Sequence, residues 1–151
     1  MKKHLKKLIL LVVILVAGVY LISWSGDGKV DKVDVEIGAS SKYDQGELED
    51  AISCIKEEFR QEYSGCRLDK VYYNEEFSDK EVKSLEYKDK KSMIAIQAEY
   101  FVGPWGDSTE EKYTEIDDWC WILQKNEKTE KWEIVTSGSI GVYKIVVYFK
   151  F

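Results

Sequence analysis

Histidine is almost absent from this chain, and the residues that could replace it in a reactive site are scattered. His4 is the only histidine among 151 residues, and it stands in the basic N-terminal stretch. Serine–histidine and cysteine–histidine nucleophile systems and histidine zinc sites are therefore excluded from the rest of the chain. The three cysteines, Cys54, Cys66 and Cys120, have no C-x-x-C spacing, and there is no glycine-rich phosphate loop. The sequence predicts no metal and no cofactor.

Basic residues are also too few to serve a nucleic-acid partner. The chain has 22 Lys and Arg against 28 Asp and Glu. Four of the lysines precede an apolar N-terminal run, so the remainder has 18 basic residues and a net charge of −10. An acidic surface repels phosphate backbones, and no Lys/Arg cluster interleaved with aromatics makes a local exception. We expect no nucleic-acid partner and no adhesion to anionic lipid.

The apolar run covers residues 8–22 without interruption. With Leu5 and Trp24 at its ends it reaches about 20 residues, enough to cross ~30 Å of hydrocarbon. We therefore interpret residues 1–25 as a membrane anchor that contacts the bilayer through residues 5–24. Lysines before such a run stay in the cytoplasm, so the rest of the chain should lie outside the cell membrane.

A cleaved signal segment is the alternative to an anchor. Signal cleavage needs small residues at the first and third positions before the cut. Ser23 and Ser25 form a weak site of this kind just before Gly26. If it were used, the domain would be secreted.

The remainder divides into a polar spacer, residues 26–42, and an α+β domain, residues 43–151. The spacer contains a possible short extended piece. Asp44 and Glu47 form a capping box that predicts the start of a long helix, and Gly65 predicts its left-handed stop. One apolar stripe runs along this helix: Leu48, Ile52, Ile55, Phe59 and Tyr63.

A second capping box, Ser78 with Glu81, predicts a short helix that ends near Tyr87. An extended segment, "CRLDKVYYNEEF", precedes it, and three strands follow: "SMIAIQAEYFVG", "EIDDWCWILQ" and "KWEIVT". "KNEKTE" should join the last two as a hairpin, and the final "IGVYKIVVYFKF" is strongly β-forming. The order predicts an α+β fold in which a curved antiparallel sheet wraps the long helix and leaves a cone.

Strand alternation puts Trp119, Trp121 and Leu123 on one face, and Cys120 and Ile122 on the other. Both faces are apolar, which predicts a central strand covered on each side. Trp119 should lie closer to the mouth of the cone. Trp121 should pack against the long helix at Ile52, Ile55 or Phe59.

The cysteines favour an interpretation as small buried hydrophobic residues. A Cys54–Cys66 disulfide is the alternative. It would be strained, because about nine helical residues carry the chain some 13 Å from Cys54 and three extended residues return at most ~10 Å.

The segments "YDQGELEDAISCIKEEFRQEYSGCRLDKVYYNEE", "SMIAIQAEYFVG" and "WCWILQKNEKTEKWEIVTSG" resemble a family of small bacterial proteins. Its members often carry an N-terminal anchor and a nuclear transport factor 2-like domain, within the cystatin-like fold group. The resemblance covers residues 43–138 and implies that fold, but no functional residue. The family tends to end soon after the W-x-I-V strand, so the stretch 139–151 departs from it.

Two functions follow from these observations. The first is an extracytoplasmic membrane-anchored module that binds a small molecule, a peptide or an envelope protein, with Trp119, Asp118 and Glu99 at the cone mouth as candidate contacts. The second is an isomerase or dehydratase that uses a carboxylate as general base. That enzyme needs an Asp or Glu in an apolar pocket, and the candidates are Asp117, Asp118 and Glu99.

Overall fold

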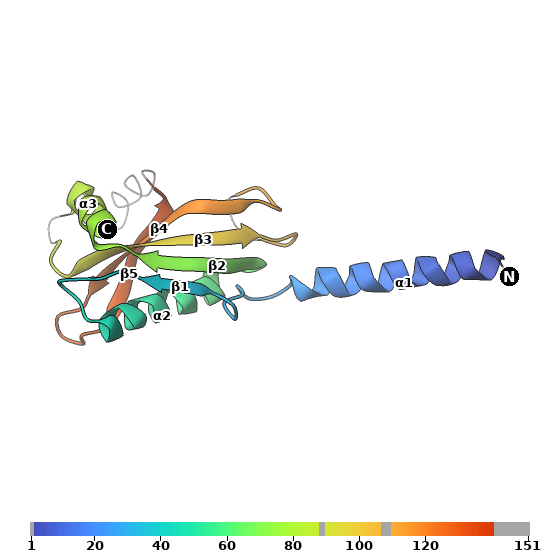
Figure 1. The fold of residues 1–151 in the computed structure, drawn as a ribbon, viewed down its shortest axis with the longest axis horizontal. Helices are drawn as coiled ribbons and strands as arrows, with labels where there is room; N and C mark the ends of the chain where they lie inside the picture. Colours follow the sequence, from blue (N-terminus) through green and yellow to red (C-terminus); the bar gives the residue numbers. More distant parts are fainter. Residues whose placement is uncertain (1, 88–89, 107–109, 141–151) are drawn as a thin grey trace.

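The computed structural model of the chain describes residues 2–87, 90–106 and 110–140 (Figure 1). Among these residues it contains α1 Lys2–Ser23, β1 Asp34–Ile37, α2 Gln45–Glu62, β2 Cys66–Tyr73, α3 Glu75–Ser84, β3 Met93–Val102, β4 Glu115–Lys125 and β5 Trp132–Ser139. The strands form one sheet in the order β1-β2-β3-β4-β5. The α+β class and the apolar N-terminal helix are confirmed.

The sheet is mixed, which corrects the prediction of a purely antiparallel one. β1 runs parallel to β2, with Val35 opposite Val71, and the other neighbouring strands are antiparallel. A parallel pair needs a long crossover connection, and α2 lies in that connection. Residues 34–37 are therefore part of the sheet, although they fall inside the predicted spacer, residues 26–42.

Local signals set the limits of α2. The Asp44 side chain accepts a hydrogen bond from the Glu47 backbone N–H at 2.8 Å, and the Glu47 carboxylate accepts one from the Asp44 N–H at 3.0 Å. These bonds satisfy N–H groups at the start of the helix that have no intrahelical partner. After the helix ends at Glu62, Gly65 adopts φ +69°, which glycine tolerates because it has no Cβ. The predicted capping box and glycine stop are confirmed.

α3 begins four residues earlier than the second capping box predicts. Asn74, not Ser78, is the N-cap, and its side chain accepts a backbone N–H of the first turn at 2.9 Å. Ser78 lies one turn inside the helix, where its buried hydroxyl accepts the Ala95 N–H of β3 at 2.9 Å. The helix ends at Ser84 rather than near Tyr87, because the next residue is buried and adopts extended backbone.

Two hydrophobic clusters lie on opposite faces of the sheet. The larger cluster combines buried side chains of α2 with side chains of β2, β3, β4 and β5. The smaller cluster uses the alternate positions of β3 and β4, and side chains of α3 pack against it. Figure 1 shows α2 and α3 on different sides of the strands.

The predicted alternation along β4 is confirmed. Trp121 and Leu123 belong to the larger cluster and Trp119 packs against it, whereas Cys120 and Ile122 belong to the smaller one. Trp121 therefore shares its cluster with the predicted helix partners: Ile52, Ile55 and Phe59.

The hairpin between β4 and β5 also follows the prediction. Residues 126–131 connect the two strands, and Leu123 pairs with Ile134. The Trp132 indole N–H donates to the Glu47 carbonyl oxygen at 2.9 Å, which ties this hairpin to the first turn of α2. Of the strongly β-forming segment predicted at the chain end, residues 141–151 lie outside the described residues.

None of the three cysteines forms a disulfide, which supports their interpretation as small hydrophobic side chains. Cys66 and Cys120 are buried and Cys54 is half-buried on α2. Burial raises the pKa of the Cys54 thiol. The alternative Cys54–Cys66 disulfide is not formed.

Trp24 joins α1 to the domain. Residues 4–23 form a helix long and apolar enough to cross a membrane, with no part of it buried, which is compatible with an anchor or a signal sequence. Trp24 follows directly and is only 8% exposed. Its ring packs against Phe101, with ring centroids 5.3 Å apart, and the Arg67 guanidinium lies 5.4 Å from its centroid. Gly103 is required beside it, because a Cβ there would overlap the Trp24 ring.

The chain remains attached to the domain immediately after this tryptophan. Gly26, Gly28 and Lys29 each form a backbone hydrogen bond, 2.9–3.0 Å long, to residues 60–66. The start of the predicted spacer is thus fixed to the end of α2 and the beginning of β2.

Candidate functional site

Aromatic rings gather in the half of the core that is nearer to α1. Tyr63 caps the C-terminus of α2, and its ring lies 5.6 Å from Tyr100, 6.1 Å from Trp119 and 5.5 Å from Trp121, between centroids. Phe59 stacks on Tyr63 from one turn earlier, at 4.6 Å. We call these five residues the aromatic cluster.

Three polar atoms inside the aromatic cluster have no hydrogen-bond partner of normal geometry. They are the Tyr100 hydroxyl and the indole N–H groups of Trp119 and Trp121. Tyr100 and Trp121 are each only 1% exposed. A buried polar group without a partner costs about 1–3 kcal/mol, so three in one cluster mark a place where a further molecule could supply the missing bonds.

The two phenols of the aromatic cluster are neutral at physiological pH. Burial raises the pKa of Tyr63 to about 12, although Ser137 and Trp119 oppose this by hydrogen bonding. The Tyr63 and Ser137 hydroxyl oxygens are 3.3 Å apart. Burial also raises the pKa of Tyr100, and the neighbouring Tyr63 adds to the effect.

The chemistry of the aromatic cluster is that of donors without charge. Its free groups are two indole N–H donors and one phenol, which can donate or accept. None of its five members can act as a general base at neutral pH. The arrangement suits recognition of an uncharged acceptor, such as a carbonyl or ether oxygen, between aromatic faces.

The structure brings together only part of the site predicted from sequence. Trp119 belongs to the aromatic cluster and is half-buried. Asp118 is next to it, but its side chain is exposed, and its carbonyl oxygen accepts the Ile140 N–H at 2.7 Å. Asp117 is also exposed. Glu99 is half-buried on the opposite face of the sheet, because the larger hydrophobic cluster takes the positions on either side of it in β3.

None of the carboxylates proposed for an enzyme is therefore buried within the aromatic cluster. Among the described residues, the acidic side chain that is buried is Glu81, which is 5% exposed. It lies on α3, which packs against the smaller hydrophobic cluster on the opposite face.

Sequence reasoning missed Tyr63, Tyr100 and Ser137. Tyr63 ends the apolar stripe of the long helix, so it was assigned to the core. Tyr100 alternates in register with Ile94, Ile96 and Ala98, and this period-two pattern does signal its face. Nothing local to Ser137 shows that its hydroxyl meets Tyr63 across the core.

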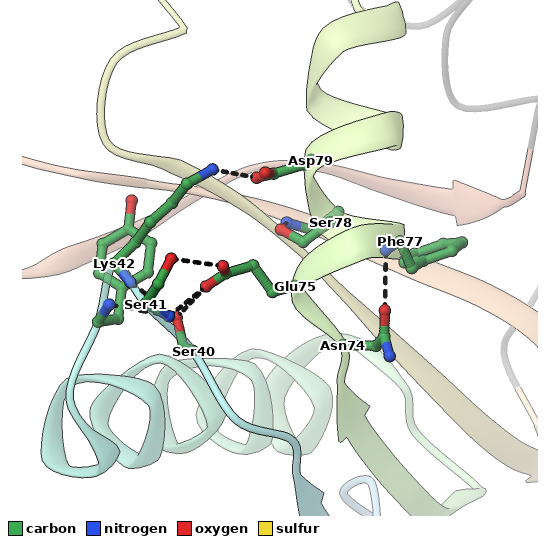
Figure 2. A network of polar contacts seen from close by, with 10 residues as sticks. Ser40, Ser41, Lys42, Asn74, Glu75, Phe77, Ser78 and Asp79 are labelled. Carbon is green, nitrogen blue, oxygen red and sulfur yellow. Dashed lines mark hydrogen bonds and ion pairs between the residues drawn. The ribbon is translucent and has the colours of Figure 1, made fainter.

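A separate polar network lies at the other end of the domain (Figure 2). The Glu75 carboxylate, at the start of α3, accepts hydrogen bonds from the Ser40 hydroxyl at 2.5 Å, the Ser41 N–H at 2.7 Å and the Ser41 hydroxyl at 2.7 Å. These bonds lower the pKa of Glu75 to about 2. Lys42 pairs with Asp79 one turn along α3. Every polar group named here is partnered, so the network holds the β1–α2 connection to α3.

Two open hollows flank this connection. One, of about 640 Å³, is lined by residues from Val35 to Glu49, and the other, of about 460 Å³, by residues of α3, Lys42, Tyr43 and the start of β3. Within the described parts of the chain, no group of three His, Cys, Asp or Glu side chains could hold a metal ion.

No family model, curated protein or solved structure matches the chain. The functional proposal therefore depends on the aromatic cluster and on the junction between α1 and the domain at Trp24, called the α1 junction.

Proposed function

We propose that the protein is a membrane-anchored extracytoplasmic module whose domain binds an uncharged molecule, free or part of a peptide, through hydrogen-bond acceptors. The binding site is the aromatic cluster. The observation that carries the proposal is the set of three buried polar atoms, on Tyr100, Trp119 and Trp121, that have no hydrogen bond of normal geometry.

The α1 junction supports an anchor over a cleaved signal segment. The weak cleavage site lies before Gly26, so cleavage there would remove Trp24. Trp24 is buried against Phe101, and Gly103 leaves room for its ring. Retention of Trp24 in the packing of the folded domain supports an uncleaved segment. The four lysines before the span support an N-terminus in the cytoplasm.

The fold type proposed is the nuclear transport factor 2-like domain of the cystatin-like group. The sequence resemblance supports it, together with the shared cluster of α2 and sheet side chains. Three register shifts, in the β2–β3, β3–β4 and β4–β5 pairs, also support a bent sheet, because bulges bend strands locally.

Proton–nitrogen correlation NMR of the tryptophan indole N–H groups tests the binding site. A panel of small neutral amides and ketones is added to the ¹⁵N-labelled protein in detergent. At least one member should shift the indole signals of Trp119 and Trp121, while the exposed Trp105 stays unchanged. Tyr100→Phe should weaken the response.

Tyr73→Phe is the matched control. Tyr73 is also buried, but it lies at the end of β2 near Ser40, away from the aromatic cluster. It should leave the response intact. If no probe shifts the Trp119 or Trp121 signals, or if all five tryptophans shift alike, the aromatic cluster is not a binding site.

A further inference from the structure

Trp105 presents an unusual combination of exposure and attachment. It lies between β3 and β4, and its side chain is 53% exposed. Its indole N–H nevertheless donates to the carbonyl oxygen of Leu21, in the last turn of α1, at 3.1 Å. The polar edge of the ring is thus bonded to the apolar helix, although about half of the residue remains exposed.

This hydrogen bond fixes the depth of Trp105 relative to the helix. Leu21 stands two residues before Ser23, where α1 ends. At about 1.5 Å per residue the contact lies ~3 Å inside the end of the helix. If residues 4–23 span the hydrocarbon, the Trp105 ring lies at its boundary, where tryptophan rings are enriched.

Side chains bond the last carbonyl oxygens of α1. The last carbonyl oxygens of a helix lack intrahelical partners and must be satisfied otherwise. The Ser23 hydroxyl donates to the Tyr20 carbonyl oxygen at 2.6 Å, and the Ser25 hydroxyl donates to that of Ile22 at 2.7 Å. At the carbonyl between them, that of Leu21, the Trp105 indole N–H adds a second bond to the one donated by the Trp24 backbone N–H at 3.2 Å.

The domain cannot swing away from this end of the helix without losing packing. Trp24 is buried against Phe101 and fits the space left at Gly103. The backbone bonds from residues 26–29 to residues 60–66 leave no flexible linker. The loop at residues 103–106 is therefore held at one height above the apolar span.

We propose that this loop rests in the headgroup layer of the bilayer, with the exposed face of Trp105 in contact with lipid. This inference depends on the proposed anchor. The partner is a zwitterionic lipid surface, because the chain after the anchor lysines has a net charge of −10 and anionic lipid would repel it.

Fluorescence quenching in vesicles tests the docking. The full chain is reconstituted in phosphatidylcholine that carries bromine near the glycerol end of its acyl chains. The wild-type protein should lose part of its tryptophan emission. W105F should show a smaller quenched fraction, because a lipid-facing ring is gone. W132F removes a tryptophan at the opposite end of the domain, so its quenched fraction should rise.

Flotation of the same vesicles on a density gradient separates the two proposals. If the chain does not float with the vesicles, the anchor fails. If it floats but W105F and W132F give the same quenched fraction as the wild type, the anchor stands and the docking of residues 103–106 is wrong.

Discussion

Hydrogen bonding of buried polar groups differs between the two ends of the domain. One end adjoins α1, and the other carries the β4–β5 hairpin. Near α1, the indole N–H groups of Trp119 and Trp121 have no hydrogen-bond partner of normal geometry, and the Trp119 group only approaches Tyr63. At the hairpin end, the Trp132 indole N–H donates to the Glu47 carbonyl oxygen at 2.9 Å, and the Glu47 carboxylate also binds Lys125 at 2.5 Å. These indole N–H groups thus form a hydrogen bond at the hairpin end and lack one of normal geometry at the end near α1. The hydrogen bonds at the hairpin end hold secondary-structure elements together. The polar groups near α1 are still able to form hydrogen bonds.

The largest expected effect comes from truncating the centre of the aromatic cluster. Trp121→Ala removes a side chain that is 1% exposed, and such changes cost about 3–5 kcal/mol. We expect the domain to be nearly or fully unfolded, as measured by urea denaturation followed by circular dichroism. Asp118→Ala, at an exposed neighbour, should keep the wild-type midpoint. An unchanged midpoint for Trp121→Ala with lost probe binding would mean that the tryptophan serves binding alone.

Trp24→Ala should be the next in size, because it empties the junction between α1 and the sheet. We expect a loss of about 3 kcal/mol, at the lower end for a buried tryptophan because water can enter the space. Urea unfolding in detergent, followed by near-ultraviolet circular dichroism, measures it. Tyr20→Ala, on the half-exposed face of α1, is the control and should change little. Equal stability of both variants would show that the packing of Trp24 does not stabilise the domain.

A pair of phenol deletions compares the two ends directly. Tyr100→Phe removes a buried hydroxyl without a partner and should leave stability unchanged or raise it by about 1 kcal/mol. Tyr73→Phe removes a hydroxyl that lies beside Ser40, where hydrogen bonding opposes the rise of its pKa, and should lower stability by about 1 kcal/mol. Thermal unfolding of both variants gives the comparison. A loss of the same size for Tyr100→Phe would mean that its hydroxyl is satisfied after all.

The smallest effect concerns pH at the hairpin end. The pKa of Glu75 is lowered from 4.5 to about 2, so its stabilising contribution is complete above pH 4.5 and disappears as the pH falls through about 2. Glu75→Gln should therefore be less stable than the wild type at neutral pH, and the difference should close over that window. Glu76→Gln, at the exposed neighbour, should show no such trend in urea midpoints measured from pH 7 to pH 2. A constant Glu75→Gln difference would rule out the carboxylate network as its cause.

Signals confined to a few residues were read correctly from the sequence. The Asp44 capping box and the alternation of Trp119 and Trp121 depend on neighbours within four positions. The sequence alone does not separate Asn74 from Ser78 as the N-cap of α3, because Ser78 also begins a capping-box pattern. What decides against Ser78 is its hydrogen bond to the Ala95 N–H, which only the packing of α3 on β3 creates.

Pairings between distant segments were not accessible to the same reasoning. β1 is short and mostly exposed, so no apolar pattern marks it as a strand, and its partner β2 lies beyond an entire helix. The candidate site residues are also separated by packing. Trp119 packs against the larger hydrophobic cluster, whereas strand alternation sends the Glu99 side chain to the other face.

The spatial order of the strands equals their order along the chain. Each strand therefore adds to the free edge left by the one before it, and none has to insert between two strands already paired. A chain held at its N-terminus and emerging residue by residue can build this sheet from β1 outward without rearrangement. Assembly during synthesis can then proceed in a single direction, from the N-terminal edge strand toward β5.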